Sequence, residues 1–264
     1  MIKNYVKAES LEQAYVLNQQ RFNCIIAGNL WVRMSKQNIT TAIDLSDLGL
    51  DRIEETEEEF RIGCMTSLRQ LEKHEGLQQY SNYAVREAVR NIVGVQFRNL
   101  ATVGGSIFGR FGFSDVLTVF LVMDSYVELY HAGIVPLREF VDMPGDRDIL
   151  VRLIVKKQPA QYLYQSVRGA KTDFPTLTCA AAKQDTGYTF AIGARPQRAV
   201  LITDEKKLLT EPLTKECVEA FANDVAESVE MRDNMRGSAA YRTHLAKVLV
   251  TRALTQLGGN NDAG

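Results

Sequence analysis

The sequence predicts an α+β fold: two small α/β subdomains followed by a C-terminal antiparallel sheet with helices. Short β-type runs alternate with helical stretches up to residue 158. Three β-type runs then follow one another over residues 162–167, 176–182 and 188–193, separated by turn signals as an antiparallel meander requires. Two long helical stretches, residues 215–229 and 239–257, complete the pattern. With 264 residues, 45% of them hydrophobic, the chain can bury the cores of two or three such subdomains.

Residues 1–50 form the first predicted subdomain. Ser10 and Gln13 read as a capping box that opens a short helix. A strand over residues 24–27 leads into a loop, and a helical turn over 31–35 and a strand over 41–45 follow.

Residues 51–158 form the second predicted subdomain. A strand pair over residues 51–63 carries the acidic run Glu57, Glu58 and Glu59 at its turn, which we interpret as a solvated hairpin tip. The remaining elements expected here are helices over 67–74, 82–92, 115–123 and 136–141 and strands over 126–130 and 149–155.

Residues 159–264 form the third predicted domain, the meander with its two helices. Ser238 is the expected N-cap of the last helix, and the tail of residues 258–264 is expected to be disordered.

The central stretch, residues 97–107, is the strongest local signal. A β-branched Thr102-Val103 pair runs into Gly104-Gly105, which predicts a strand broken by a tight turn with positive φ. Two residues without Cβ let consecutive amides converge on an anion, framed by the Thr102 and Ser106 hydroxyls. An ordinary β-turn is the alternative interpretation. Arg98 would add positive charge on the same side.

A second glycine loop lies upstream, where the strand over residues 24–27 breaks at Gly28 and Asn29. Both residue types tolerate the left-handed conformation. Two such loops predict a long ligand that contains a pyrophosphate.

These loops resemble the FAD-binding medium subunits of the molybdenum hydroxylases, the group that includes xanthine dehydrogenase and carbon monoxide dehydrogenase. The family's first motif, Ala-Gly-Gly-Thr/Ser, is matched by Ala27-Gly28-Asn29-Leu30. Its second, Arg-Asn-x-Ala-Thr-x-Gly-Gly-Asn-Ile with a later Ser-Asp, is matched by Arg98-Asn99-Leu100-Ala101-Thr102-Val103-Gly104-Gly105-Ser106-Ile107 and Ser114-Asp115. Its third, Arg-Gly-Ser-x-x-Tyr-Arg, is matched by Arg236-Gly237-Ser238-Ala239-Ala240-Tyr241-Arg242.

The resemblance covers essentially the whole chain and implies a PCMH-type FAD-binding fold with FAD as cofactor. By matching position, the FAD-binding residues are Ala27, Gly28, Asn29, Leu30, Thr102, Gly104, Gly105, Ser106, Asp115 and Tyr164. The backbone amides of Gly28, Asn29, Gly104, Gly105 and Ser106 would hold the pyrophosphate, and Thr102 would add a hydroxyl. Asp115 would accept from ribityl or ribose hydroxyls. The chain departs from the family at Asn29 and Leu30, where a glycine and a hydroxyl residue are usual.

Two positions keep two interpretations. Tyr164 stands where many relatives place a lysine close to the flavin, and simple strand packing is its other interpretation. The aromatic and basic insert over residues 108–113 would either cover the flavin ring or fill a subunit interface.

The family implies an electron-transfer role. The chain would take electrons from a [2Fe-2S] small subunit through FAD to NAD or another acceptor, while substrate reacts on a molybdopterin-binding large subunit. A flavin-free assembly scaffold of the same complex is the alternative, and the altered residues 29–31 distinguish the two. A self-sufficient FAD oxidase is a weaker alternative, because the chain lacks the length of a separate substrate domain.

Composition excludes several other classes. A net charge of −1 argues against a nucleic-acid surface, and no apolar run is long enough to span a membrane. The start of the sequence lacks the apolar core of a signal peptide, so a cytoplasmic location is expected. The four cysteines are far apart and the three histidines do not cluster, so we expect reduced thiols and no metal site. No pattern of catalytic acid, base or nucleophile appears, so reactivity must come from a cofactor.

Overall fold

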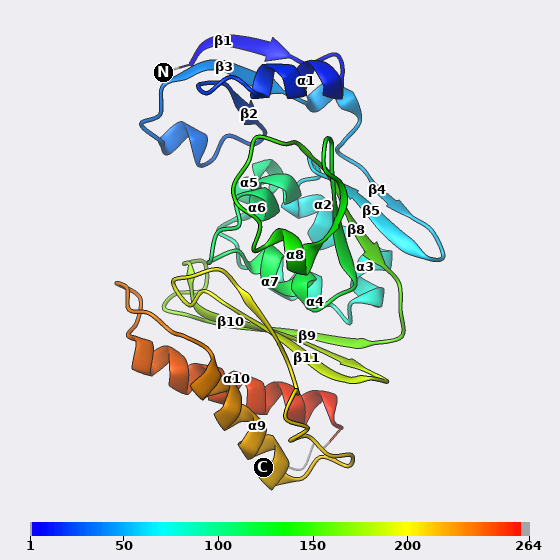
Figure 1. Ribbon diagram of the computed structural model, residues 1–264, viewed down its shortest axis with the longest axis vertical. Helices are drawn as coiled ribbons and strands as arrows, with labels where there is room; N and C mark the ends of the chain where they lie inside the picture. Colours follow the sequence, from blue (N-terminus) through cyan, green and yellow to red (C-terminus); the bar gives the residue numbers. More distant parts are fainter. Residues whose placement is uncertain (1, 260–264) are drawn as a thin grey trace. The chain divides into compact units, whose positions relative to one another are not determined.

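The computed structural model describes residues 2–259, and within them the chain forms two compact units (Figure 1). The first unit consists of residues up to 74, 93–109 and 125–157. The second consists of residues 75–92, 110–124 and the chain from 158 onward. Each unit is therefore assembled from segments far apart in the sequence. The predicted domain limits at residues 50 and 158 stay a prediction.

The first unit opens with a small parallel sheet. Its strands β1 (Ile2–Lys7), β2 (Cys24–Ile26) and β3 (Ile39–Asp44) lie in the order β1-β3-β2, and helix α1 (Leu11–Asn18) connects the first two. The Ser10 hydroxyl accepts the Gln13 N–H at 3.1 Å, as predicted for an N-cap. The Gln13 side chain accepts the Glu9 N–H at 2.7 Å. In a capping box this second bond would come from the N–H of the N-cap, Ser10, so here it is made by the preceding residue. A 3₁₀ turn, η1 (Val32–Met34), precedes β3, and a second, η2 (Ser46–Leu48), follows it.

A five-stranded antiparallel sheet forms the larger part of this unit. Its order is β4 (Ile53–Glu55), β5 (Glu59–Gly63), β8 (Leu150–Lys156), β6 (Ser125–Leu129) and β7 (Gly133–Pro136). The helices of this part are α2 (Leu68–Lys73), α5 (Val95–Leu100), α6 (Val103–Phe108) and α8 (Leu137–Phe140). Helix α6 packs against β5 and β8, and α2 packs against α5. The acidic run lies at the tip of the β4–β5 hairpin, as predicted.

The second unit is a four-stranded antiparallel sheet covered on both faces. Its strands are β9 (Gln161–Arg168), β10 (Pro175–Gln184), β11 (Gly187–Gly193) and β12 (Val200–Thr203), in the order β12-β11-β10-β9. Its helices are α3 (Glu75–Tyr80), α4 (Ala84–Val89), α7 (Asp115–Leu121), α9 (Lys215–Ser228) and α10 (Ala239–Leu257). The meander and both C-terminal helices confirm the sequence prediction. The prediction missed α3, α5, α6, β7 and β12.

Strand β10 is buried on both faces of the sheet. Its first eight residues are all buried, and small side chains, Ala180–Ala182 among them, keep both faces close to their neighbours. On one face Leu177, Cys179 and Ala181 join the apolar core formed with α9 and α10. On the other face α7 packs against β10 and β11, and α4 packs against β9.

Arg242, the last residue of the third family motif, fastens α10 to the sheet. Its side chain is fully buried on α10. Its guanidinium donates to the carbonyl oxygens of Thr176, Ala194, Arg232 and Gly237 and to Asn234 Oδ1. Gly237 and Ser238 also help to hold α10 on the sheet. A Cβ at residue 237 would lie only 3.1 Å from the Thr176 side chain, so glycine permits the close approach. The Ser238 hydroxyl caps the helix by accepting the Tyr241 N–H. This motif is therefore structural.

We expect Arg242→Met to lower the free energy of unfolding by at least about 3 kcal/mol, because several buried acceptors each lose a donor at about 1–3 kcal/mol. Urea unfolding followed by circular dichroism measures it. The matched control is Arg252→Met on the same helix, whose parent side chain is exposed and which should change stability by less than about 0.5 kcal/mol. Equal losses in both variants would contradict the assignment of Arg242 as an anchor.

Candidate functional site

The first glycine loop follows β2 and touches the end of α5. A Cβ on Gly28 would lie 2.5 Å from the Leu100 carbonyl carbon and 3.2 Å from the Ala101 nitrogen. Only a residue without a side chain permits this approach of two backbones. The loop at residues 27–30 therefore lies beside the segment that leads into Thr102, so the structure brings the two predicted loops together within the first unit.

Three consecutive amides of this loop are available to a ligand. Asn29 has φ 56°, the left-handed conformation expected for it. Among the residues that the structure describes, no acceptor takes the N–H of Gly28, Asn29 or Leu30. The Asn29 carbonyl accepts the Arg33 N–H at 3.0 Å and so holds the loop against η1. Successive N–H groups around a left-handed residue form a concave anion site.

The central stretch differs from its prediction, because it contains helix ends in place of a strand and turn. Helix α5 ends at Leu100, Thr102 is the N-cap of α6, and Gly104 and Gly105 lie in the first turn of α6 without positive φ. The Thr102 hydroxyl accepts the Gly105 N–H at 3.2 Å. Glycine disfavours helices, so the pair resembled a turn, whereas the Thr102 cap was the signal that identifies a helix start.

The amides of α6 are already engaged by protein acceptors. The Gly104 N–H donates to the Cys64 carbonyl at 2.8 Å, and the Ser106 N–H and hydroxyl both donate to the Thr102 carbonyl. A Cβ on Gly104 would lie 2.8 Å from Cys64 O and 2.9 Å from Cys64 Cβ, whereas one on Gly105 would meet only Thr102 Oγ1, at 3.3 Å. Gly104 is therefore required by packing, and the expectation of two converging free amides here is wrong. Gly105 leaves a bare, accessible Cα.

Arg98 does not supply charge to a ligand. Its Nε donates to Glu72 Oε2 at 2.9 Å, and both side chains are buried. Burial alone would raise the pKa of the Glu72 carboxyl, but the bonds from Arg69 and Arg98 lower it below its usual value. The expectation for Arg98 is corrected: it joins α5 to α2 and so supports the segment on which the first loop rests.

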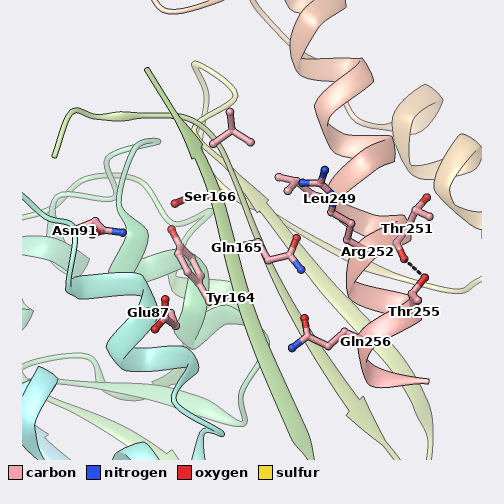
Figure 2. Close-up of a pocket in the computed structure, with 11 residues that line it drawn as sticks. Glu87, Asn91, Tyr164, Gln165, Ser166, Leu249, Thr251, Arg252, Thr255 and Gln256 are labelled. Atoms are coloured by element: carbon pink, nitrogen blue, oxygen red, sulfur yellow. Dashed lines mark hydrogen bonds between the residues drawn. The ribbon is translucent and has the colours of Figure 1, made fainter. Parts of the chain in front are cut away.

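The second unit contains an open cavity of about 880 Å³ along strand β9 (Figure 2). Tyr164, Gln165 and Ser166 of β9 line it, with Glu87 and Asn91 from the α4 segment and several residues of α10. Tyr164 points to the α4 side of the strand and Gln165 to the α10 side.

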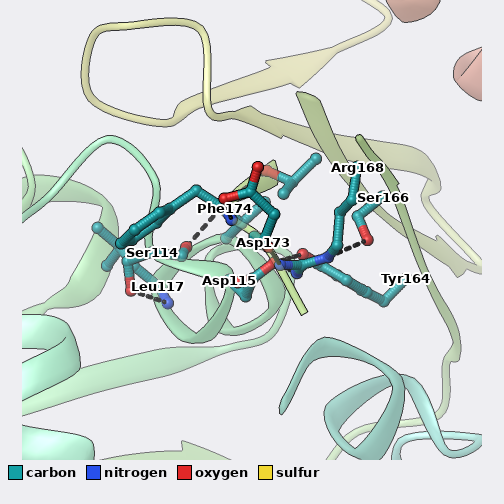
Figure 3. A network of polar contacts seen from close by, with 10 residues as sticks. Ser114, Asp115, Leu117, Tyr164, Ser166, Arg168, Asp173 and Phe174 are labelled. Atoms are coloured by element: carbon teal, nitrogen blue, oxygen red, sulfur yellow. Dashed lines mark hydrogen bonds and ion pairs between the residues drawn. The ribbon is translucent and has the colours of Figure 1, made fainter. Parts of the chain in front are cut away.

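Asp115 and Tyr164, the two remaining predicted residues, meet in a buried network of the second unit (Figure 3). Asp115 Oδ1 accepts from the Tyr164 hydroxyl and from Arg168 Nη2, and Arg168 also donates to the Asp173 carbonyl at 2.6 Å. Burial raises the pKa of the Asp115 carboxyl, opposed by the Arg168 charge, and burial beside this carboxyl raises the pKa of Tyr164. Both side chains thus tie β9 to α7, which favours the packing interpretation of Tyr164. A role of Asp115 toward ligand hydroxyls stays a prediction.

The aromatic insert divides between the units. Phe108 packs at 6.1 Å from Phe140 in the first unit. In the second unit Phe111 stacks on Phe113 at 5.2 Å, and Phe113 meets the edge of Phe174 at 4.8 Å. Phe111 is 44% exposed, so both the lid and the interface interpretation remain open for it.

Two family models together match nearly the whole chain. The model of the FAD binding domain in molybdopterin dehydrogenase matches residues 1–157. The chain belongs to this FAD-binding family. The model of the CO dehydrogenase flavoprotein C-terminal domain matches residues 162–257. As a molybdopterin dehydrogenase FAD-binding chain, it is an oxidoreductase subunit of the medium type, and the cofactor of its family is FAD.

Curated relatives are similar over much of this FAD-binding chain. The xanthine dehydrogenase FAD-binding subunit of Escherichia coli O157:H7 is 27% identical over 214 residues, 74% of this chain and 73% of the relative. The carbon monoxide dehydrogenase medium chain of Hydrogenophaga pseudoflava is 24% identical over 184 residues, 64% of each chain. A protein of Escherichia coli K12 named as uncharacterized, YgfM, is 25% identical over 255 residues, 95% of this chain and 94% of the relative.

Solved structures confirm the predicted fold class. Carbon monoxide dehydrogenase from Hydrogenophaga pseudoflava superimposes with a TM-score of 0.85 at 22% identity, covering 97% of both chains. Quinoline 2-oxidoreductase from Pseudomonas putida 86 superimposes with a TM-score of 0.86 at 18% identity, covering 98% of this chain and 97% of that chain. Within residues 2–259, no helix has the length and apolar character needed to cross a membrane.

We expect Gly104→Ala and Gly105→Ala to separate the two glycines of α6. Gly104→Ala should lose about 1–3 kcal/mol of stability, because its methyl group overlaps the Cys64 backbone. Gly105→Ala should match or exceed the parent, because alanine favours a helix over glycine by about 1 kcal/mol. Urea unfolding measures both. Similar losses at the two positions would show that our account of the central motif is incorrect.

Proposed function

We propose that this chain is the FAD-carrying electron-transfer subunit of a molybdenum hydroxylase complex. The observation that carries the proposal is a run of three amides, at Gly28, Asn29 and Leu30, that no acceptor within residues 2–259 takes, in a loop held beside the second family motif. Water can satisfy these half-exposed amides in the free chain, but a flavin-free scaffold would have no use for three adjacent donors around a left-handed residue.

The residues of the first unit fit a dinucleotide pyrophosphate. Phosphate oxygens accept the N–H groups of a concave backbone loop, and the left-handed Asn29 makes the loop concave. Leu30 supplies no hydroxyl, but its amide remains a donor, so the departure from the family motif removes a side-chain contact and keeps the backbone contacts.

In our proposal the second family motif forms one wall of the cofactor site. Hydrogen bonds within the protein hold this segment rigid. Thr102 caps α6, Gly104 lets that helix approach Cys64, and Ser106 ties its first turn. Gly105 presents backbone without a side chain, which leaves room for a ligand. Ala27 joins this loop region to β2, and Asp115 and Tyr164 remain proposed contacts of the second unit.

Bound FAD would supply the redox chemistry, since flavins exchange electrons singly or in pairs. The chain's own residues bind and orient the cofactor. We propose that electrons arrive from a [2Fe-2S] small subunit and leave to NAD or another acceptor, and that a molybdopterin-binding large subunit carries the substrate reaction. Two relatives are named as an FAD-binding subunit of xanthine dehydrogenase and a medium chain of carbon monoxide dehydrogenase, which supports an assembly with other subunits. The proposed location is cytoplasmic.

Purification from the native host tests the assembly. The chain should co-purify with an iron–sulfur protein and a molybdopterin protein, and the FAD-loaded chain alone should oxidise no purine, aldehyde or heterocycle. If NAD is its acceptor, the FAD-loaded chain alone should reduce dyes slowly with NADH. Turnover of an organic substrate by the pure chain would contradict an electron-transfer role.

We expect Asn29→Val to weaken FAD binding about tenfold or more, which corresponds to about 1.4 kcal/mol. A β-branched residue resists positive φ, so the amides lose their concave arrangement. Asn29→Gly is the matched control, because glycine adopts this conformation freely and should keep the parent affinity within about twofold. Flavin fluorescence titration measures both.

If neither the parent nor Asn29→Gly binds FAD while both are folded by circular dichroism, the scaffold function replaces the proposal. Equal FAD affinity in Asn29→Val and the parent would place the pyrophosphate elsewhere.

A further inference from the structure

We propose that the free edge of β9 is a docking site for an extended, acidic segment of another polypeptide, which adds to the second unit's sheet as a fifth strand. In the part of the chain that the structure describes, β9 is the last strand of its sheet and pairs with β10 on one side alone. This inference does not depend on FAD binding.

The hydrogen-bond pattern identifies the backbone groups that face this edge. The Tyr162 N–H points away from β10, because it donates to Asn82 Oδ1 at 3.0 Å. In an antiparallel pair the outward groups alternate, so the N–H and C=O of Tyr164 and Ser166 also face outward. The pairing of β10 with β11 agrees with this assignment. Gln184 pairs with Gly187 at the β10–β11 turn, so its backbone N–H and C=O face β11. The backbone groups of Lys183, and of every second residue before it on β10, therefore face β9.

One half of the edge is covered and the other half is open. Asn82 covers the Tyr162 N–H, and the Tyr80 hydroxyl accepts the Gln158 N–H at 3.3 Å. The other half, at Tyr164 and Ser166, faces the cavity of about 880 Å³ (Figure 2). Exposed strand edges are usually blocked by proline, lysine or a covering element, and β9 contains neither proline nor lysine. The open half is therefore suited to strand addition.

The side chains around the open half specify the chemistry of the occupant. Asn91, Gln165, Thr255 and Gln256 surround the edge with amides and a hydroxyl, which suit a polar backbone. Glu87 is already paired with Arg90 at 2.8 Å. Arg252 on α10 is exposed and has no ion-pair partner in the described chain. A segment that carries a carboxylate on its α10-facing side would complete this site.

A synthetic probe tests the proposal on the full chain: the fluorescent, end-blocked heptapeptide Thr-Val-Thr-Glu-Thr-Val-Thr. We expect saturable binding by fluorescence anisotropy. Binding should weaken about tenfold or more when every backbone nitrogen of the peptide is methylated or when its Glu is replaced by Lys. Arg252→Glu should reverse the preference between the Glu and Lys peptides.

Ser166→Pro should abolish binding, because it removes an outward donor and leaves the β9–β10 bonds intact, whereas Ser166→Ala should bind as the parent does. Absence of binding, or binding insensitive to backbone methylation, would overturn the proposal even if Ser166→Pro failed to fold. A dimer in sedimentation experiments that Ser166→Pro converts to monomer would also overturn it, because the occupant would then be a second copy of this chain.

Discussion

The approach of the Gly28 backbone to the Leu100 carbonyl is the constraint on which the proposed cofactor site depends. It places the loop after β2 of the small parallel sheet against the end of α5, two residues before the cap of α6. Any side chain at residue 28 would separate these segments. The buried Arg98–Glu72 pair holds α5 against α2 and thereby keeps the platform under this contact in place.

The family motifs contain both structural residues and ligand-facing ones, and the structure separates them. Gly104 is required because its helix packs closely against Cys64. Arg242 is required because it donates to buried acceptors, the Thr176 carbonyl among them. Asn29 and Leu30, which depart from the motif, retain the unpaired amides. A motif residue is thus a poor guide to ligand contact until its hydrogen bonds are known. Backbone donors persist when a side chain changes, so a site built from amides tolerates substitutions that a site built from hydroxyls would not.

The sequence was sufficient for the fold class, the C-terminal meander and the left-handed Asn29, because alternation, helical periodicity and residue conformational preference are local properties. It was insufficient at Gly104 and Gly105, where tertiary contacts with Cys64 and the Thr102 cap override a weak helix propensity. It also misassigned Arg98, since nothing local reveals that Glu72 lies beside it. The interleaving of segments 75–92 and 110–124 with the C-terminal sheet depends on long-range packing of α4 and α7, which no local pattern contains.

The most direct test of the first loop as the pyrophosphate site is a titration of the ¹⁵N-labelled chain with FAD, followed by amide nuclear magnetic resonance. The account predicts large shifts for the amides of Gly28, Asn29 and Leu30, which acquire phosphate acceptors, and a small shift for Gly104, whose N–H keeps the Cys64 carbonyl. Large shifts at Gly104 and Gly105 with an unchanged first loop would contradict it.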